Sequence, residues 1–139
     1  MTKSKKISKK VPLHKHLLIN GHTLTPPTSK RRLKKWLNQL VHDIGMKRIG
    51  GPFIRYVKAE GNRGFTAVVM IETSHIALHV WDEGPKPYFR FDLYTCGPLH
   101  HTTVLNEVQV FLDAEDLEWM AIDREEGFFE YDNGRRPVR

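Results

Sequence analysis

Two strand-like runs meet within residues 64–83, which read GFTAVVMIETSHIALHVWDE. Both runs, Gly64–Thr73 and His75–Trp81, are rich in the β-branched and aromatic residues that favour strands. Successive side chains point to opposite faces of a strand, so the second run should turn an apolar face toward a core and a polar face away from it. The core-facing residues are Ile76, Leu78 and Val80, and the opposite face carries His75, Ala77 and His79. Ser74 falls between the runs, where we expect the chain to kink.

Further strands flank this pair on both sides. Phe53–Val57 and Tyr88–Tyr94 are similar runs, separated from it by loops that contain Gly, Asn or Pro. Four consecutive strands with no helix between them indicate antiparallel pairing. Additional strands are expected at His14–Asn20 near the start of the chain and at Leu117–Ile122 near its end.

Two segments have the periodicity of helices. In the first, Thr28 or Ser29 can cap the N-terminus and Gly45 can end the helix. Its apolar residues recur at helical spacing and are Leu33, Trp36, Leu37, Leu40, Val41 and Ile44. Thr102 or Thr103 is the predicted cap of the second helix. The apolar residues of this second helix are Leu105, Val108, Phe111 and Leu112.

These elements predict an α+β fold in which an antiparallel β-sheet is backed by two helices on one face, as in a two-layer α/β sandwich. The length of 139 residues fits a single domain. We place that domain at residues 13–131. A disordered basic arm is expected at residues 1–12 and a loose tail at residues 132–139.

Charge and cysteine content narrow the functional classes. The net charge of +6 arises mainly near the N-terminus, where 11 of the 22 Lys and Arg residues lie within residues 1–35. No aromatic residues interleave with the lysines of the arm, so we expect no specific nucleic-acid binding.

One cysteine cannot form an internal disulfide, and no signal peptide or membrane-spanning run is recognisable, which indicates a soluble, cytoplasmic protein. The eight histidines show no zinc-ligand spacing, so no metal site is predicted.

Three short motifs carry a resemblance to a known family. Thr73-Ser74-His75 is followed by His79-Val80-Trp81-Asp82-Glu83 and then by Thr95-Cys96-Gly97. The set, within about residues 14–112, resembles the small prokaryotic S-adenosylmethionine decarboxylases. In that family a Glu-Ser-His stretch leads to a His-x-Trp-x-Glu stretch and a Thr-Cys-Gly stretch. The resemblance implies a carboxy-lyase that makes its own pyruvoyl cofactor and supplies the aminopropyl donor for spermidine.

Self-cleavage between Thr73 and Ser74 is part of what the resemblance implies. The Ser74 hydroxyl would attack the Thr73 carbonyl to give an ester, and β-elimination would release residues 1–73 and leave a dehydroalanine. Hydrolysis of the dehydroalanine yields a pyruvoyl group at the head of residues 74–139. This group would form a Schiff base with the α-amine of the substrate and accept the electrons released as carbon dioxide leaves.

Further roles follow from the same resemblance. His79 matches the family histidine that serves processing, and Thr66 carries a hydroxyl where the family has a helper serine. Cys96 matches the cysteine that returns a proton to the product. Trp81 and Glu83 match positions that contact the nucleoside of S-adenosylmethionine, by ring packing and by hydrogen bonds to the ribose hydroxyls. Two processed protomers are expected to form a homodimer, with sites near their interface.

Two departures from the family pattern keep alternatives open. Residues 57–63 contain no counterpart of the family's adenine-stacking phenylalanine, which favours a related decarboxylase of ornithine or arginine. Thr73 stands where the family usually has glutamate, and its β-branched side chain crowds the carbonyl that Ser74 must attack. This second departure favours a homologue that neither cleaves nor catalyses and that acts by association.

Overall fold

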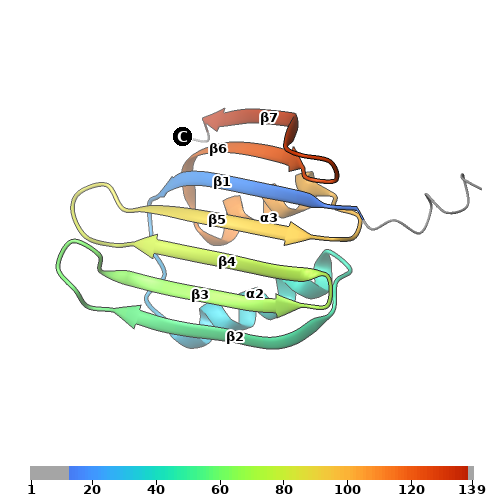
Figure 1. Cartoon of the computed structure of the whole chain (residues 1–139). Coiled ribbons are helices and arrows are strands. Elements are labelled where there is room, and N and C mark those ends of the chain that lie inside the picture. The colour runs from blue at the N-terminus through green and yellow to red at the C-terminus, as the bar shows by residue number, and fades with distance from the viewer. Residues whose placement is uncertain (1–12, 138–139) are drawn as a thin grey trace, which may run out of the picture.

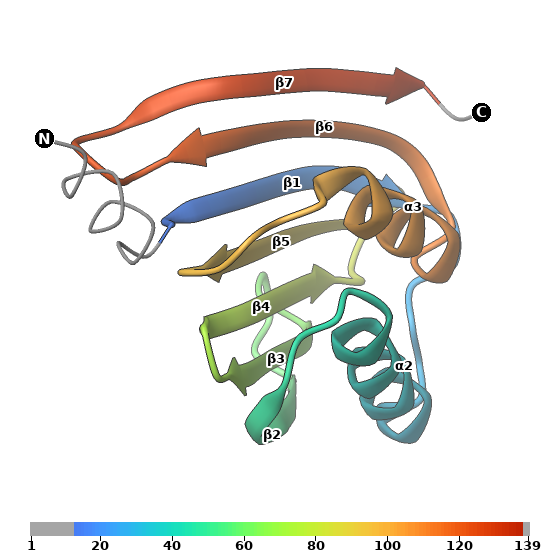
Figure 2. The same ribbon diagram turned by 90° about the vertical axis from the view of Figure 1, so that its right-hand side faces the viewer.

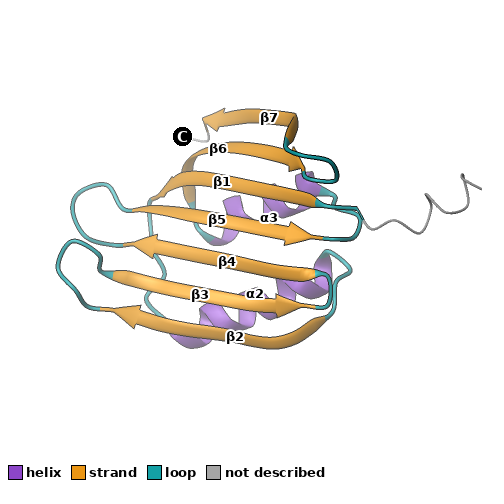
Figure 3. Cartoon of the chain, viewed as in Figure 1, coloured by secondary structure: helices purple, strands orange, loops and turns teal. Residues whose placement is uncertain are grey.

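Seven strands and two helices make up residues 13–137, the part of the chain that the computed structural model describes. In chain order they are β1 (Lys15–Thr23), α2 (Lys30–Asp43), β2 (Arg48–Val57), β3 (Gly64–Ile71), β4 (Ser74–Trp81), β5 (Tyr88–Thr95), α3 (His101–Phe111), β6 (Ala114–Asp123) and β7 (Phe129–Pro137). Figures 1 and 3 show the strands side by side in one sheet. The basic arm predicted at residues 1–12 lies outside the described residues.

The strands follow the order β2-β3-β4-β5-β1-β6-β7, and every neighbouring pair is antiparallel. The predicted α+β class and the antiparallel pairing are therefore confirmed. β2 to β5 are neighbours in chain order, whereas β1 crosses over to lie between β5 and β6 (Figure 1). A strand from the start of the chain is thus enclosed by strands from its second half.

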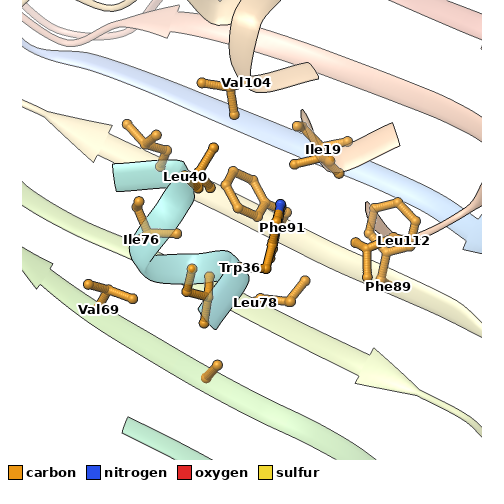
Figure 4. Packing of buried hydrophobic residues seen from close by; sticks show 14 of the residues in the cluster. Ile19, Trp36, Leu40, Val69, Ile76, Leu78, Phe89, Phe91, Val104 and Leu112 are labelled. Atoms are coloured by element: carbon orange, nitrogen blue, oxygen red, sulfur yellow. The ribbon is translucent and has the colours of Figure 1, made fainter. Parts of the chain in front are cut away.

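One face of the sheet carries the hydrophobic core. Figure 2 shows α2 and α3 on the same side of the sheet. Buried residues of both helices and of the strands form one cluster (Figure 4). Trp36 of α2 stacks on Phe111 of α3 with ring centroids 4.3 Å apart, which joins the two helices. The alternation predicted for β4 is confirmed, because Ile76, Leu78 and Val80 are buried while His75, Ala77 and His79 are half-buried on the opposite face.

The two helices begin differently. The Oγ of Ser29 caps α2 by accepting a hydrogen bond from the backbone N–H of Arg32 at 3.1 Å. α3 begins at His101, and the residue before it provides no side-chain capping hydrogen bond. The predicted caps Thr102 and Thr103 are therefore wrong, since both lie inside the first turn of α3.

Neither helix in the described part of the chain is both long and apolar enough to cross a membrane.

The predicted C-terminal tail is wrong as far as Pro137. Phe129–Pro137 pairs with β6 as the edge strand β7, so the sheet continues through most of the supposed tail. The side chains of β7 are mostly polar and largely exposed, which hid the strand from an alternation pattern. A Cβ on Gly134 would lie 2.8 Å from Cζ2 of Trp119, so the missing side chain leaves room for this ring of β6.

Candidate active site

The predicted cleavage site lies at the turn between β3 and β4. Ile71 pairs with Ser74, so only Glu72 and Thr73 lie between the paired ends of the two strands. Ser74 has a φ of 146°. Residues with a side chain rarely occupy this region, which costs about 1–3 kcal/mol. The kink expected at Ser74 is therefore present, and backbone strain is concentrated at the residue whose hydroxyl would attack.

The end of β5 lies against this turn. The backbone N–H of Cys96 donates a hydrogen bond to the carbonyl oxygen of Thr73 at 2.8 Å. The buried hydroxyl of Thr95 donates to Oγ1 of Thr73 at 2.8 Å, and the backbone N–H of Gly97 donates to Oγ1 of Thr95 at 3.0 Å. The fold thus brings Thr73 and Ser74 together with Cys96, which is a free and half-buried thiol.

His79 and Thr66 form a second group, away from the turn. They are paired across β4 and β3, with Nδ1 of His79 3.4 Å from Oγ1 of Thr66. His79 is five positions beyond Ser74 along β4, which at about 3.3 Å per residue places them roughly 16 Å apart. A single chain therefore does not bring His79 or Thr66 to the Thr73–Ser74 bond.

Trp81 lies with this second group. Its ring is 5.9 Å from the ring of His79 and stacks on Tyr88 at 4.8 Å. Its Nε1–H donates to Oδ1 of Asn62 at 2.7 Å. Sequence reasoning missed Tyr88 and Asn62. Tyr88 could have been found from the pairing of β4 with β5, which sets it opposite Trp81, whereas Asn62 lies in a loop without a recognisable pattern.

Glu83, in the loop after β4, is hydrogen-bonded to the loop between β2 and β3. Its Oε1 accepts a hydrogen bond from the backbone N–H of Gly61 at 2.8 Å. The neighbouring Asp82 accepts from the hydroxyl of Tyr56 at 2.6 Å and from Nε–H of Arg63 at 3.0 Å. The hydrogen bond to Asp82 raises the pKa of Tyr56 above its ordinary value of 10.0. Glu83 therefore orders the loop between β2 and β3, in addition to its predicted contact with the ribose.

A polar cluster that the sequence did not reveal lies on the open face of the sheet, beside the Ser74 end. The carboxylate of Asp92 is 3.3 Å from Nε2 of His16 and 3.5 Å from Nε2 of His75. Arg124 donates to Nδ1 of His16 at 3.1 Å and lies over the ring of Tyr94 at 4.5 Å. Since Nδ1 of His16 accepts, we assign the ring proton to Nε2, facing Asp92. No group of three or more potential metal ligands was found in the described part of the chain.

At the same end of the sheet, β1 contributes an ion pair. Lys15 lies between Thr95 of β5 and Asp123 of β6, with its Nζ 3.1 Å from Asp123 and 3.3 Å from Glu125. Burial lowers the pKa of Lys15, but hydrogen bonds to the two carboxylates outweigh it and raise the pKa overall. The backbone N–H of Glu125 and then Lys15 lower the pKa of Asp123. Both charges are therefore retained at neutral pH next to Thr95.

Comparison with known proteins agrees with the three motifs. The family described as S-adenosylmethionine decarboxylase has a sequence model that matches residues 15–125. The chain belongs to the S-adenosylmethionine decarboxylase family. The family predicted from the motifs is thereby confirmed, and both groups of site residues lie inside the matched range.

Curated relatives in the S-adenosylmethionine decarboxylase family bear names that refer to a precursor. One is the S-adenosylmethionine decarboxylase proenzyme of Methanococcus maripaludis strain C5, which is 37% identical over 73 residues, or 50% of this chain and 55% of the relative. Another is the S-adenosylmethionine decarboxylase proenzyme of Persephonella marina, which is 31% identical over 65 residues, or 47% of this chain and 44% of the relative. The chain thus spans about half the length of the curated relatives it matches.

Proposed function

We propose that the chain is a pyruvoyl-dependent S-adenosylmethionine decarboxylase that forms by self-cleavage between Thr73 and Ser74. The observation that carries this proposal is the geometry of that peptide bond. Ser74 has a strained φ of 146°, and the carbonyl of Thr73 accepts a hydrogen bond from the N–H of Cys96. Membership of the family and the proenzyme names of the relatives support it. The product would be the aminopropyl donor for spermidine.

The N–H of Cys96 is well placed to assist cleavage. Attack by Oγ of Ser74 on the carbonyl carbon of Thr73 would put negative charge on the oxygen that this N–H already contacts, and a fixed donor stabilises such charge. The C–N bond between the two residues then breaks, which leaves an ester and a free amine and releases the strain in φ of Ser74. Loss of the Ser74 Cα proton and cleavage of its Cβ–Oγ bond free the Thr73 carboxylate. Water converts the remaining dehydroalanine into the pyruvoyl group with loss of ammonia.

The pyruvoyl group supplies an electrophilic carbonyl that binds the α-amine of the substrate and accepts electrons as carbon dioxide leaves. The backbone N–H of Cys96 already contacts the cleavage site, and we assign the Cys96 thiol the return of a proton to the substrate Cα. Trp81 and Glu83 would hold the nucleoside. The stacked rings of Trp81 and Tyr88 offer an aromatic surface suited to a nucleobase.

In this proposal a complete site requires a second copy of the chain. His79 and Thr66 lie on the open face, roughly 16 Å from Ser74 in the same chain. A two-fold axis that lies between the two facing sheets, over the middle of β4 near Ala77, would reverse the strand direction in the partner and bring the partner's His79 toward Ser74. The open face also exposes apolar side chains that a partner would cover: Leu18, Val68, Met70 and Met120. The proposed assembly is therefore a homodimer in which the open faces of the two sheets meet.

Co-expression of two inactive variants tests the shared site. Ser74→Ala removes the nucleophile, His79→Ala removes the histidine, and each variant alone should stay at full length. In a mixed dimer, Ser74 of the His79→Ala chain meets an intact histidine, so a tagged His79→Ala chain should be cleaved. The control is the same tagged chain expressed with untagged His79→Ala. If the tagged chain stays intact in the mixture with Ser74→Ala, the shared site is contradicted.

A decarboxylase of ornithine or arginine is the second candidate. Residues 58–63 add no aromatic ring to the Trp81 group, and the ring of Trp81 already stacks on Tyr88. Release of carbon dioxide from S-adenosylmethionine, ornithine and arginine by the processed protein separates the two candidates. We expect release from S-adenosylmethionine, and release from a basic amino acid alone would favour the second candidate.

A further inference from the structure

We propose that Thr95 is a positioning residue for self-cleavage and that it acts through the side chain of Thr73. The inference rests on the proposed cleavage between Thr73 and Ser74. It explains how a chain with threonine before the attacking serine can still present a carbonyl in a reactive orientation.

The hydroxyl of Thr95 takes part in two hydrogen bonds. Its Oγ1 accepts from the backbone N–H of Gly97 at 3.0 Å. The same hydroxyl donates to Oγ1 of Thr73 at 2.8 Å. Thr95 is fully buried. A buried hydroxyl without a partner is costly, so this donor holds Thr73 firmly.

Two hydrogen bonds from the end of β5 fix Thr73 at two points. The N–H of Cys96 holds its carbonyl oxygen, and the hydroxyl of Thr95 holds its side chain. Because one contact is on the backbone and the other on Oγ1, together they restrict rotation about the bond that orients the carbonyl. The same rotamer places the methyl group of Thr73 beside Gly97. A Cβ added to Gly97 would lie 3.5 Å from Cγ2 of Thr73. The β-branched side chain thus has a defined place instead of rotating freely beside the carbonyl.

The test is the rate of self-cleavage of refolded full-length chain, followed by intact mass. Thr95→Val keeps the shape but removes the donor, and we expect cleavage roughly tenfold slower. Thr95→Ser keeps the hydroxyl and should cleave within about threefold of the parent. Thermal midpoints of the same changes in a Ser74→Ala background show whether each variant folds.

A double-mutant cycle with Thr73→Val separates positioning from general structural damage. If Thr95 acts through Thr73, the Thr73→Val/Thr95→Val chain should cleave no slower than Thr73→Val alone. The inference would be overturned if the slowing of cleavage in the double variant equals the product of the slowing in the two single variants. It would also be overturned by a Thr95→Val chain that cleaves at the parental rate. A parent chain that stays at full length would overturn the proposed function and this inference together, whereas the other two outcomes leave the proposed function standing.

Discussion

Cleavage after Thr73 should leave two fragments that stay together under native conditions. Residues 1–73 carry β1, α2, β2 and β3, and residues 74–139 carry the remaining elements. β1 is paired with both β5 and β6, and β3 is paired with β4. Three strand pairings therefore cross between the fragments, and one strand of the first fragment is enclosed on both sides by strands of the second.

The free energy that holds the two fragments together can be estimated from the side chains that these strands bury. Four large aliphatic residues of β1 and β3 are at most 1% exposed, namely Leu17, Ile19, Val69 and Ile71. Burial of such a side chain contributes about 1.5–3 kcal/mol, so the four together contribute about 6–12 kcal/mol. This is comparable to the whole stability of a small domain, about 5–15 kcal/mol. Separation of the fragments should therefore require unfolding.

A protease site inserted between Glu72 and Thr73 allows the assay to be done without self-cleavage. The variant carries Ser74→Ala and an N-terminal tag, and it is cut while folded. Capture of the tag should retain residues 74–139 in native buffer. The same residues should be released in denaturant. Leu17→Asp should abolish retention because it buries a charge, whereas Val110→Asp, at an 80% exposed position of α3 away from the open face, should preserve it. Release of the second fragment in native buffer, or retention with Leu17→Asp, would refute this reasoning.

Other consequences can be measured separately. Cys96→Ala should still cleave but lose normal turnover, and full activity of this variant would refute the proton-donor role. Ser29→Ala should lower the free energy of unfolding by about 0.5–2 kcal/mol because it removes the cap of α2, whereas equal losses from Thr28→Ala would show that the cap is misassigned. The backbone N–H of Glu125 and then Lys15 hold the pKa of Asp123 below its ordinary value of 3.8, so these contacts stabilise the fold above that pH and the benefit disappears as the pH falls through the folded-state pKa. Urea denaturation should accordingly show parent and Asp123→Asn converging in stability between about pH 6 and about pH 3, and a constant difference would contradict the assignment.

Elements with a regular apolar pattern were predictable from the sequence. The alternation in β4 identified its buried face, and helical spacing identified α2. β7 was missed because an exposed edge strand needs no apolar face, and the position of β1 between β5 and β6 leaves no local trace in the sequence. Such long-range pairings are set by the packing of the whole sheet.

The sequence supplied candidate site residues but not their arrangement. Motifs proposed Ser74, His79 and Cys96, and only the strand geometry reveals that His79 lies roughly 16 Å from Ser74. The contacts of Thr73 with Thr95 were also hidden, because the two residues are 22 positions apart and meet only through the pairing of β4 with β5.

The mass of the purified chain tests the central claim most directly. The account predicts two fragments divided between Thr73 and Ser74, the second beginning with a pyruvoyl group, while a Ser74→Ala control stays at the full 16.2 kDa. A parent chain that remains at full length, indistinguishable from this control, would contradict self-cleavage and with it the proposed decarboxylase.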